Sequence, residues 1–278
     1  MKKIILVFVV SIFLTNLFGW GGLAHRIITQ KAMENLPADM KIPLEWKEYI
    51  IEHCSDPDKR KDETPGEEER HYIDIDFYEE FNRGEMIISK EELIEKYGEE
   101  KVTEMGVLPW AILETYQNLV HAFQQKKIDD ILLFSSDLAH YVEDGSQPLH
   151  VILNYNGKLS NQRGIHGRYE TIMIEKYETE IREKIELKPA AEIKLNLDFI
   201  FDYISDSNSL SPIIFAADLH ALKYTKDHEE QYDDEYYRLL WFKTGYITKN
   251  RLEEASNVLS SLIFSAYLEA GKPEFSGR

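Results

Sequence analysis

The sequence contains a single cysteine, Cys54, among its 278 residues, so no disulfide can form within the chain. A chain of this length can build a packed core in place of disulfides, and 43% of its residues are hydrophobic. The scarcity of cysteine therefore excludes a small disulfide scaffold, but it assigns no cellular compartment.

Positive charge is also scarce. The chain has 32 Lys and Arg residues against 50 Asp and Glu residues, which gives a formal net charge of -18. A protein that binds duplex DNA stably usually has a basic face, so this balance argues against that role. It is compatible with an enzyme whose bound metal ions supply the local positive charge.

The N-terminus has the layout of a secretion signal. Lys2 and Lys3 precede the apolar run "IILVFVVSIFLTNLF", and the small residue Gly19 stands before Trp20. The run is short for a membrane span, and no cysteine follows it to carry a lipid anchor. We predict a signal peptide over residues 1–19 and an exported protein, periplasmic or extracellular, over residues 20–278. An uncleaved membrane anchor is the alternative.

Most of the remaining chain has apolar residues at helical intervals, and strand patterns are few. The helices are expected over residues 23–36, 108–125, 129–145, 166–185, 226–245 and 251–271. Residues 71–78, "HYIDIDFY", alternate briefly and are expected to form an edge strand or a loop. The chain has no internal repeat and no low-complexity linker. We therefore predict an all-α fold in a single multi-helix domain.

Two histidine–carboxylate pairs stand close together in the sequence. In "HYVEDGSQPLH", His140 and Asp144 are four residues apart, and His150 follows after Gly145 and Pro148, where the chain must turn. In "GIHGRYE", His166 and Glu170 repeat the four-residue spacing. Side chains at this spacing lie on one face of a helix and can contact the same metal ion. One such pair is usually a hydrogen-bonded surface pair, whereas two pairs with a histidine between them indicate a metal site suited to zinc, with manganese or iron as alternatives.

Four further candidates lie upstream. Asp58 follows Pro57 and is expected in a turn, and His71 follows Arg70. Taken alone, they are a turn aspartate and a strand histidine. If the chain is cleaved before Trp20, the new terminal amine and the Trp20 carbonyl could chelate a metal ion together with His25, one helical turn further on. The alternative is that Trp20 is a core aromatic residue.

The ordered motifs "WGGLAH", "SDPDKR", "RHY", "HYVEDGSQPLH" and "GIHGRYE" resemble those of the zinc-dependent phospholipase C family. They are also similar to those of the related single-strand-specific zinc nucleases. The match runs from Trp20 to about Glu170, roughly half of the chain. The resemblance implies an all-helical fold that encloses three zinc ions.

The resemblance also implies a set of ligands. The first zinc would be held by Asp58, His71, His140 and Asp144. The second zinc would be held by His150, His166 and Glu170. The third zinc would be held by Trp20, His25 and Asp144, so that Asp144 bridges the first and third ions. Asp58 would either steer or deprotonate the attacking water, or serve only as a ligand.

The implied activity is zinc-dependent hydrolysis of a phosphodiester, either a phospholipid or a single-stranded nucleic acid. The phospholipid would bring transient contact with a membrane surface, and no stable protein partner is implied. Glu170 as last ligand and the absence of paired cysteines favour the phospholipase side, whereas the short spacing from Trp20 to His25 favours the nuclease side. A non-catalytic zinc-binding helical protein is the alternative of another class.

The segment "NYNGKLSNQRG" between His150 and His166 borders the expected site. Its polar side chains could contact a phosphate or a head group, or could simply form turns, and the turn interpretation is favoured. They are Asn154, Asn156, Asn161 and Arg163.

The cleavage site gives the first testable prediction. Edman sequencing of the protein exported by an expressing cell should begin Trp-Gly-Gly, because Gly19 is the small residue that ends the signal. A different first residue would remove the terminal amine of Trp20 from the ligand set.

Overall fold

The computed structural model describes residues 20–275, and this part of the chain is a single all-helical domain without β-strands. The predicted all-α fold is therefore confirmed. The predicted signal peptide, residues 1–19, lies outside the described residues. Among the described residues, no helix combines the length and apolar character that a membrane crossing requires.

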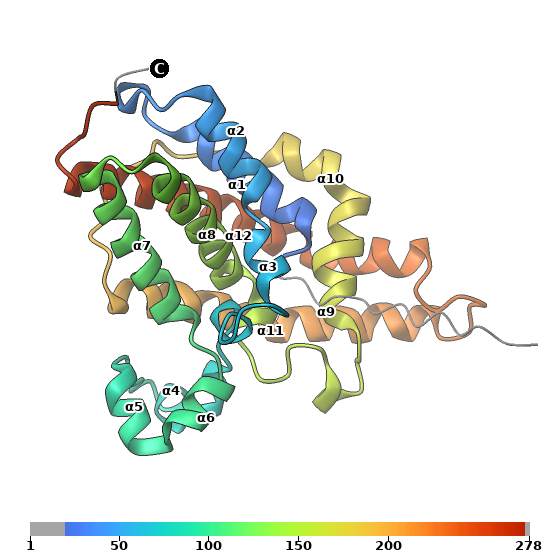
Figure 1. Ribbon diagram of the computed structural model, residues 1–278. Helices are drawn as coiled ribbons and strands as arrows, with labels where there is room; N and C mark the ends of the chain where they lie inside the picture. The colour runs from blue at the N-terminus through green and yellow to red at the C-terminus, as the bar shows by residue number, and fades with distance from the viewer. Residues whose placement is uncertain (1–19, 276–278) are drawn as a thin grey trace, which may run out of the picture.

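The α-helices are α1 Gly22–Asn35, α2 Leu44–His53, α3 Asp56–Arg60, α4 Glu79–Asn82, α5 Lys90–Tyr97, α6 Glu99–Glu104, α7 Leu108–Gln125, α8 Ile128–Ser146, α9 Ile165–Gly167, α10 Met173–Lys184, α11 Leu197–Thr225 and α12 Asp234–Glu269. Short 3₁₀ turns are η1 Ala38–Met40, η2 Glu68–His71, η3 Ile75–Phe77, η4 Pro148–His150 and η5 Lys158–Ser160. One π-helical turn, η6, spans Arg168–Ile172. Helices α4, α5 and α6 form a small lobe that projects from the main bundle (Figure 1).

Three local expectations are corrected. Of the two alternatives for residues 71–78, the edge strand is wrong and the loop is confirmed, because η2 and η3 wind the chain on either side of a short extended piece. Asp58 stands in α3 rather than in a turn, since Pro57 falls in the first turn of that helix, where proline is tolerated. The last two expected helices, residues 226–245 and 251–271, are parts of one continuous helix, α12, which begins at Asp234.

Helix α8 runs through the middle of the molecule. Helices α1, α2, α7, α11 and α12 all pack against it, and every residue from Ser135 to His150 is buried. This buried stretch includes His140, Glu143 and Asp144. Because a buried polar group without a partner is costly, these side chains require hydrogen bonds or bound cations.

Two apolar clusters lie on either side of this helix. One includes Leu119, Leu138 and Leu262, and the other includes Trp20 and Leu240. Each fully buried aliphatic side chain stabilises the fold by about 1.5–3 kcal/mol relative to an exposed one. The polar groups of α8 are therefore held between two packed cores.

The C-terminal end of α8 is fixed by a residue far along the chain. Arg251, buried on α12, donates from Nε to the Ser146 carbonyl at 3.0 Å and from Nη2 to Ser207 Oγ at 2.6 Å. Ser207 Oγ in turn donates to the Gly145 carbonyl at 2.6 Å. These bonds satisfy carbonyl groups that a helix end leaves without intrahelical partners. The chain then turns through η4 and brings His150 back beside the helix.

The extended piece after His71 is held by backbone hydrogen bonds on both sides. The Ile73 amide donates to the His150 carbonyl at 3.0 Å, and the Asp74 amide donates to the Met105 carbonyl at 2.7 Å. Gly106 has a φ of +87°, and a Cβ there would lie 2.1 Å from the Tyr72 carbonyl oxygen. Only glycine permits this approach, which sets the position of His71.

We predict that Gly106→Ala lowers the free energy of unfolding by about 3 kcal/mol or more, because the strained φ and the collision with the Tyr72 backbone add together. Gly84→Ala is the matched control, since Gly84 has a φ of +77° with nothing within 4 Å of the added Cβ. The free energy of unfolding of Gly84→Ala should fall by only about 1–2 kcal/mol. Urea unfolding of both variants measures the difference, and equal losses would contradict the backbone contact.

Candidate metal centre

The centre of the site is the buried pair on α8. His140 Nε2 lies 3.3 Å from Asp144 Oδ2, as the four-residue spacing predicts. His71, from the end of η2, places Nδ1 2.9 Å from His140 Nε2 and 3.0 Å from Asp144 Oδ2. Asp58 Oδ1 of α3 lies 3.5 Å from His140 Nε2 and 3.6 Å from His71 Nδ1. Four donor atoms from three separate segments therefore face one point.

The spacing of these atoms fits a metal ion. A tetrahedral zinc ion with bonds of about 2.0–2.1 Å has ligand atoms about 3.3 Å from one another. The distances among Asp58, His71, His140 and Asp144 run from 2.9 to 3.6 Å. The structure thus brings together all four residues that the resemblance assigns to one ion.

Asp144 faces two directions. Its Oδ2 belongs to the group just described, whereas its Oδ1 lies 3.7 Å from His25 Nε2 and 3.3 Å from His150 Nδ1. His25, His140 and Asp144 offer donor atoms within 4.8 Å of one another. A carboxylate with its two oxygens turned to different donor groups can bridge two cations, as expected for Asp144.

A further donor group lies where the chain leaves α8. His166 Nε2 is 2.9 Å from Glu170 Oε2, and His150 Nε2 is 3.6 Å from the same oxygen. Glu170 stands in the π turn η6, a form of helix that often occurs at functional sites. Gln147 Nε2 donates to Glu170 Oε2 at 2.9 Å and holds the carboxylate in place. His150, His166 and Glu170 can therefore hold an ion together.

Three of the histidines are oriented by a hydrogen bond that their Nδ1 atom makes. His140 Nδ1 bonds to the Cys54 carbonyl and His150 Nδ1 to the His71 carbonyl, both at 2.8 Å. A carbonyl can only accept, so each Nδ1 carries a proton and each Nε2 is the ring nitrogen available to a bound ion. His25 Nδ1 lies 2.5 Å from Glu143 Oε2 in the same arrangement. Histidines that bind metals are held in this way.

Several of the inward atoms have no hydrogen-bond partner although they are buried. They include His25 Nε2, His150 Nε2 and Asp144 Oδ1. Buried polar atoms without partners are rare in native proteins and require an explanation such as a bound ion. The donor chemistry, imidazole and carboxylate, is the set that zinc accepts. The residues present therefore fit metal ions.

Glu143 is a functional residue that the sequence did not single out. Its Oε1 accepts a hydrogen bond from Thr29 Oγ1 at 2.6 Å, while its Oε2 faces His25. His25 and Thr29 are four residues apart on α1, so one buried carboxylate on α8 binds two consecutive turns of that helix. One indication of its role was available in the sequence. Glu143 stands beside Asp144 in "HYVEDG", and an acid on a buried helix face needs a partner.

The electrostatics of the group favour Asp58 as a ligand. Burial by itself raises the pKa of Asp58, but the positive charges of His140 and Lys61 outweigh this effect and hold that pKa well below its usual range. Lys61 Nζ lies 2.7 Å from Asp58 Oδ1. A carboxylate with such a low pKa is a weak proton acceptor. For Glu170, in contrast, burial raises the pKa to about 8, so a cation beside it is needed to keep it charged at neutral pH.

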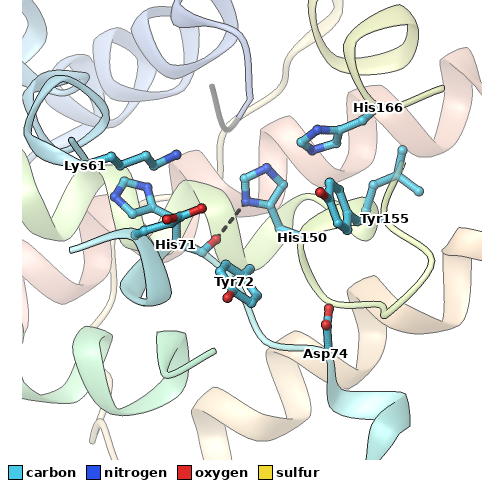
Figure 2. A pocket seen from close by; sticks show the side chains of 9 residues that line it. Lys61, His71, Tyr72, Asp74, His150, Tyr155 and His166 are labelled. Atoms are coloured by element: carbon cyan, nitrogen blue, oxygen red, sulfur yellow. Dashed lines mark hydrogen bonds between the residues drawn. The ribbon is translucent and has the colours of Figure 1, made fainter. Parts of the chain in front are cut away.

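A pocket opens onto these groups. Its volume is about 190 Å³, and its walls are formed by Lys61, Glu68, His71, Tyr72, Asp74, Leu149, His150, Tyr155 and His166. Figure 2 shows His150 between His71 and His166, with Tyr155 beside His166 and with Asp74 on the far side of the pocket. The Tyr155 and His166 rings meet edge to face, with centroids 5.6 Å apart. Two of the donor groups are thus reachable from solvent through one opening.

Trp20 lies close to the site but contributes no donor that the structure defines. Its ring is fully buried, and its Nε1 donates to Ser146 Oγ at 2.8 Å. The burial and the hydrogen bond both agree with the interpretation of Trp20 as a core aromatic residue. The ligand role of its amine requires cleavage after Gly19, within residues that lie outside the described part of the chain, and it stays a prediction.

The remaining candidates fall outside the donor groups. Asp56, the other aspartate of "SDPDKR", pairs with Lys59 and His53. His228 pairs with Asp233. The histidines that matched no motif, namely His53, His121, His220 and His228, belong to none of the three groups. Comparison of the chain with protein-family models and with curated proteins returned no match.

We predict that Glu143→Gln weakens metal binding by about 10–100-fold, because His25 loses the charged acceptor that orients it. Competition with a chelator, followed by elemental analysis, measures this affinity. Glu80→Gln is the matched control: Glu80 is also buried, but it pairs with Lys96 and Tyr97 in the α4–α6 lobe. Equal metal retention in the two variants would show that Glu143 does not act on the site.

Proposed function

We propose that the protein is a zinc-dependent phosphodiester hydrolase whose preferred substrate is a phospholipid. The observation that carries the proposal is the group His150, His166 and Glu170, which has three protein donors and borders an open pocket. Structural zinc sites are closed by four protein ligands, whereas catalytic sites keep a position for water or substrate. A site of this form suits catalysis better than stabilisation of the fold.

The proposed assignment of ions follows the donor groups. Asp58, His71, His140 and Asp144 would hold one zinc, and His150, His166 and Glu170 would hold another. His25 would join Asp144 at a third, with the amine of Trp20 if the chain is cleaved before it. Bound zinc would lower the pKa of a water molecule towards neutrality and neutralise charge on the phosphoryl oxygens.

The protein's own residues would bind and orient the substrate. Lys61, which pairs with Asp58, stands on the pocket wall, so a phosphate that enters the pocket would lie close to its ammonium group. Leu149 and Tyr155 form an apolar part of the wall, which would limit the access of bulk water. The carbonyl-bound His150 needs no reorientation before it acts, so the site is preorganised.

Glu170 and the absence of paired cysteines favour the phospholipase side of the resemblance, and the nuclease activity is the second candidate. The specific observation in its favour is that only four residues separate Trp20 from His25. A non-catalytic zinc protein remains the alternative of another class, supported by the depth at which His25, His140 and Asp144 are buried.

We predict that the zinc-loaded protein cleaves a soluble chromogenic phosphodiester and that a chelator abolishes this activity. His166→Ala should lower kcat/KM by about 100-fold or more, because it removes one of three donors at the open ion. His121→Ala is the control, since His121 is exposed on α7 and outside all three groups. Activity that survives the chelator would contradict the proposed mechanism.

The same preparation distinguishes the candidate functions. Phosphatidylcholine, single-stranded DNA and RNA would be offered in parallel with zinc present, and the preferred substrate class is the one hydrolysed with the highest kcat/KM. Three bound zinc ions without cleavage of any phosphodiester would identify the non-catalytic alternative.

A further inference from the structure

The segment that joins the two histidine pairs has an unusual charge. No acidic residue occurs between Asp144 and Glu170, although the chain has 50 in total. The same segment has Lys158 and Arg163, both exposed. This segment therefore carries local positive charge in a protein with a net charge of -18.

This segment also exposes large apolar side chains. Leu159 is 70% exposed, Tyr155 42% and Leu153 39%. Tyr155 is at the same time part of the pocket wall, so the segment with these exposed side chains borders the opening of the site. Figure 1 shows the segment, coloured yellow-green before α9, as a loop at the edge of the molecule. Residues 151–164 are called the rim loop below.

The rim loop is held in a defined shape by its own hydrogen bonds. Asn154 Oδ1 accepts from the Leu159 amide at 2.8 Å, and Asn156 Oδ1 accepts from the Gly164 amide at 2.9 Å. Gln162 Nε2 donates to Asp218 Oδ2 at 2.7 Å, which ties the loop to α11. Asn154 and Asn156 thus stabilise turns within the loop, which agrees with the interpretation favoured from the sequence. The exposure of Leu159 is therefore fixed by the fold, and ordering the loop on a ligand would cost little entropy.

We propose that the rim loop docks the protein on a phospholipid surface, with Leu159 inserted among the lipids and Lys158 and Arg163 at the phosphate groups. Amphipathic surface elements bind membranes in this way, by apolar insertion and by attraction between basic residues and lipid head groups. This inference deepens the proposed function, on which it rests for the link between the surface and the pocket.

The alternative occupant, a single-stranded nucleic acid, fits the rim loop less well. Such ligands are bound by basic grooves with aromatic side chains on which the bases stack. The rim loop has two basic residues and one exposed aromatic residue, and its most exposed apolar side chain is the aliphatic Leu159. Elsewhere the acidic chain would repel a polyanion. An exposed leucine beside an active-site pocket is better suited to lipid tails.

The test is co-sedimentation of the zinc-loaded protein with phosphatidylcholine vesicles that contain a minor fraction of phosphatidylglycerol. Leu159→Glu should weaken partitioning by about tenfold, since one leucine no longer leaves water. Leu44→Glu is the matched control, because Leu44 is 68% exposed at the start of α2, which lies at the opposite end of the view in Figure 1. It should change partitioning by less than about twofold, a surface effect of charge alone.

Metal content and thermal unfolding would show that both variants are folded. Equal loss of binding in the two variants, or no vesicle binding by the unaltered protein, would overturn the docking proposal. Binding of single-stranded DNA that depends on Leu159, without vesicle binding, would overturn it in favour of a nucleic-acid surface.

The two proposals fail separately. If the unaltered protein hydrolyses the soluble phosphodiester but does not sediment with vesicles, the docking proposal is wrong and the hydrolase proposal stands. If it binds vesicles through Leu159 but cleaves no phosphodiester, docking stands and the hydrolase proposal is wrong.

Discussion

The burial of Asp144 is the constraint on which the rest of the structure depends. This carboxylate is completely enclosed, and its two oxygens face ring nitrogens of four histidines on three sides. An isolated charge in such surroundings would be strongly destabilising, so it must be balanced by protonated histidines or by metal ions. Two packed cores hold α8, and with it Asp144, in this position.

Much of this arrangement could be predicted from the sequence. Helical periodicity was sufficient for the all-α fold, and the four-residue spacings placed His140 with Asp144 and His166 with Glu170. Local patterns succeeded there because each pair lies within one continuous helical stretch, α8 for the first pair and the joined α9 and η6 for the second. The order of the motifs then pointed to Asp58, whose partners lie on α8 and η2.

Other features depend on contacts that no local pattern encodes. Glu143 and Thr29 meet only because α1 packs beside α8, and Gln147 reaches Glu170 only after the chain has returned from the rim loop. The extended piece after His71 looked like a strand because its residues alternate, but its backbone bonds go to single residues of two loops and not to a neighbouring strand. In each case tertiary packing, not sequence periodicity, decided the geometry.

The hydrogen bonds of Arg251 connect the C-terminal third of the chain to the donor groups, although none of the described residues of that third belongs to them. By binding the last carbonyls of α8, this guanidinium fixes the angle at which the polypeptide reverses, and hence the place to which His150 returns. Substitutions on α12 can therefore shift the position of His150 while every donor residue stays the same. The arrangement of the donor atoms thus depends on a helix that carries none of them.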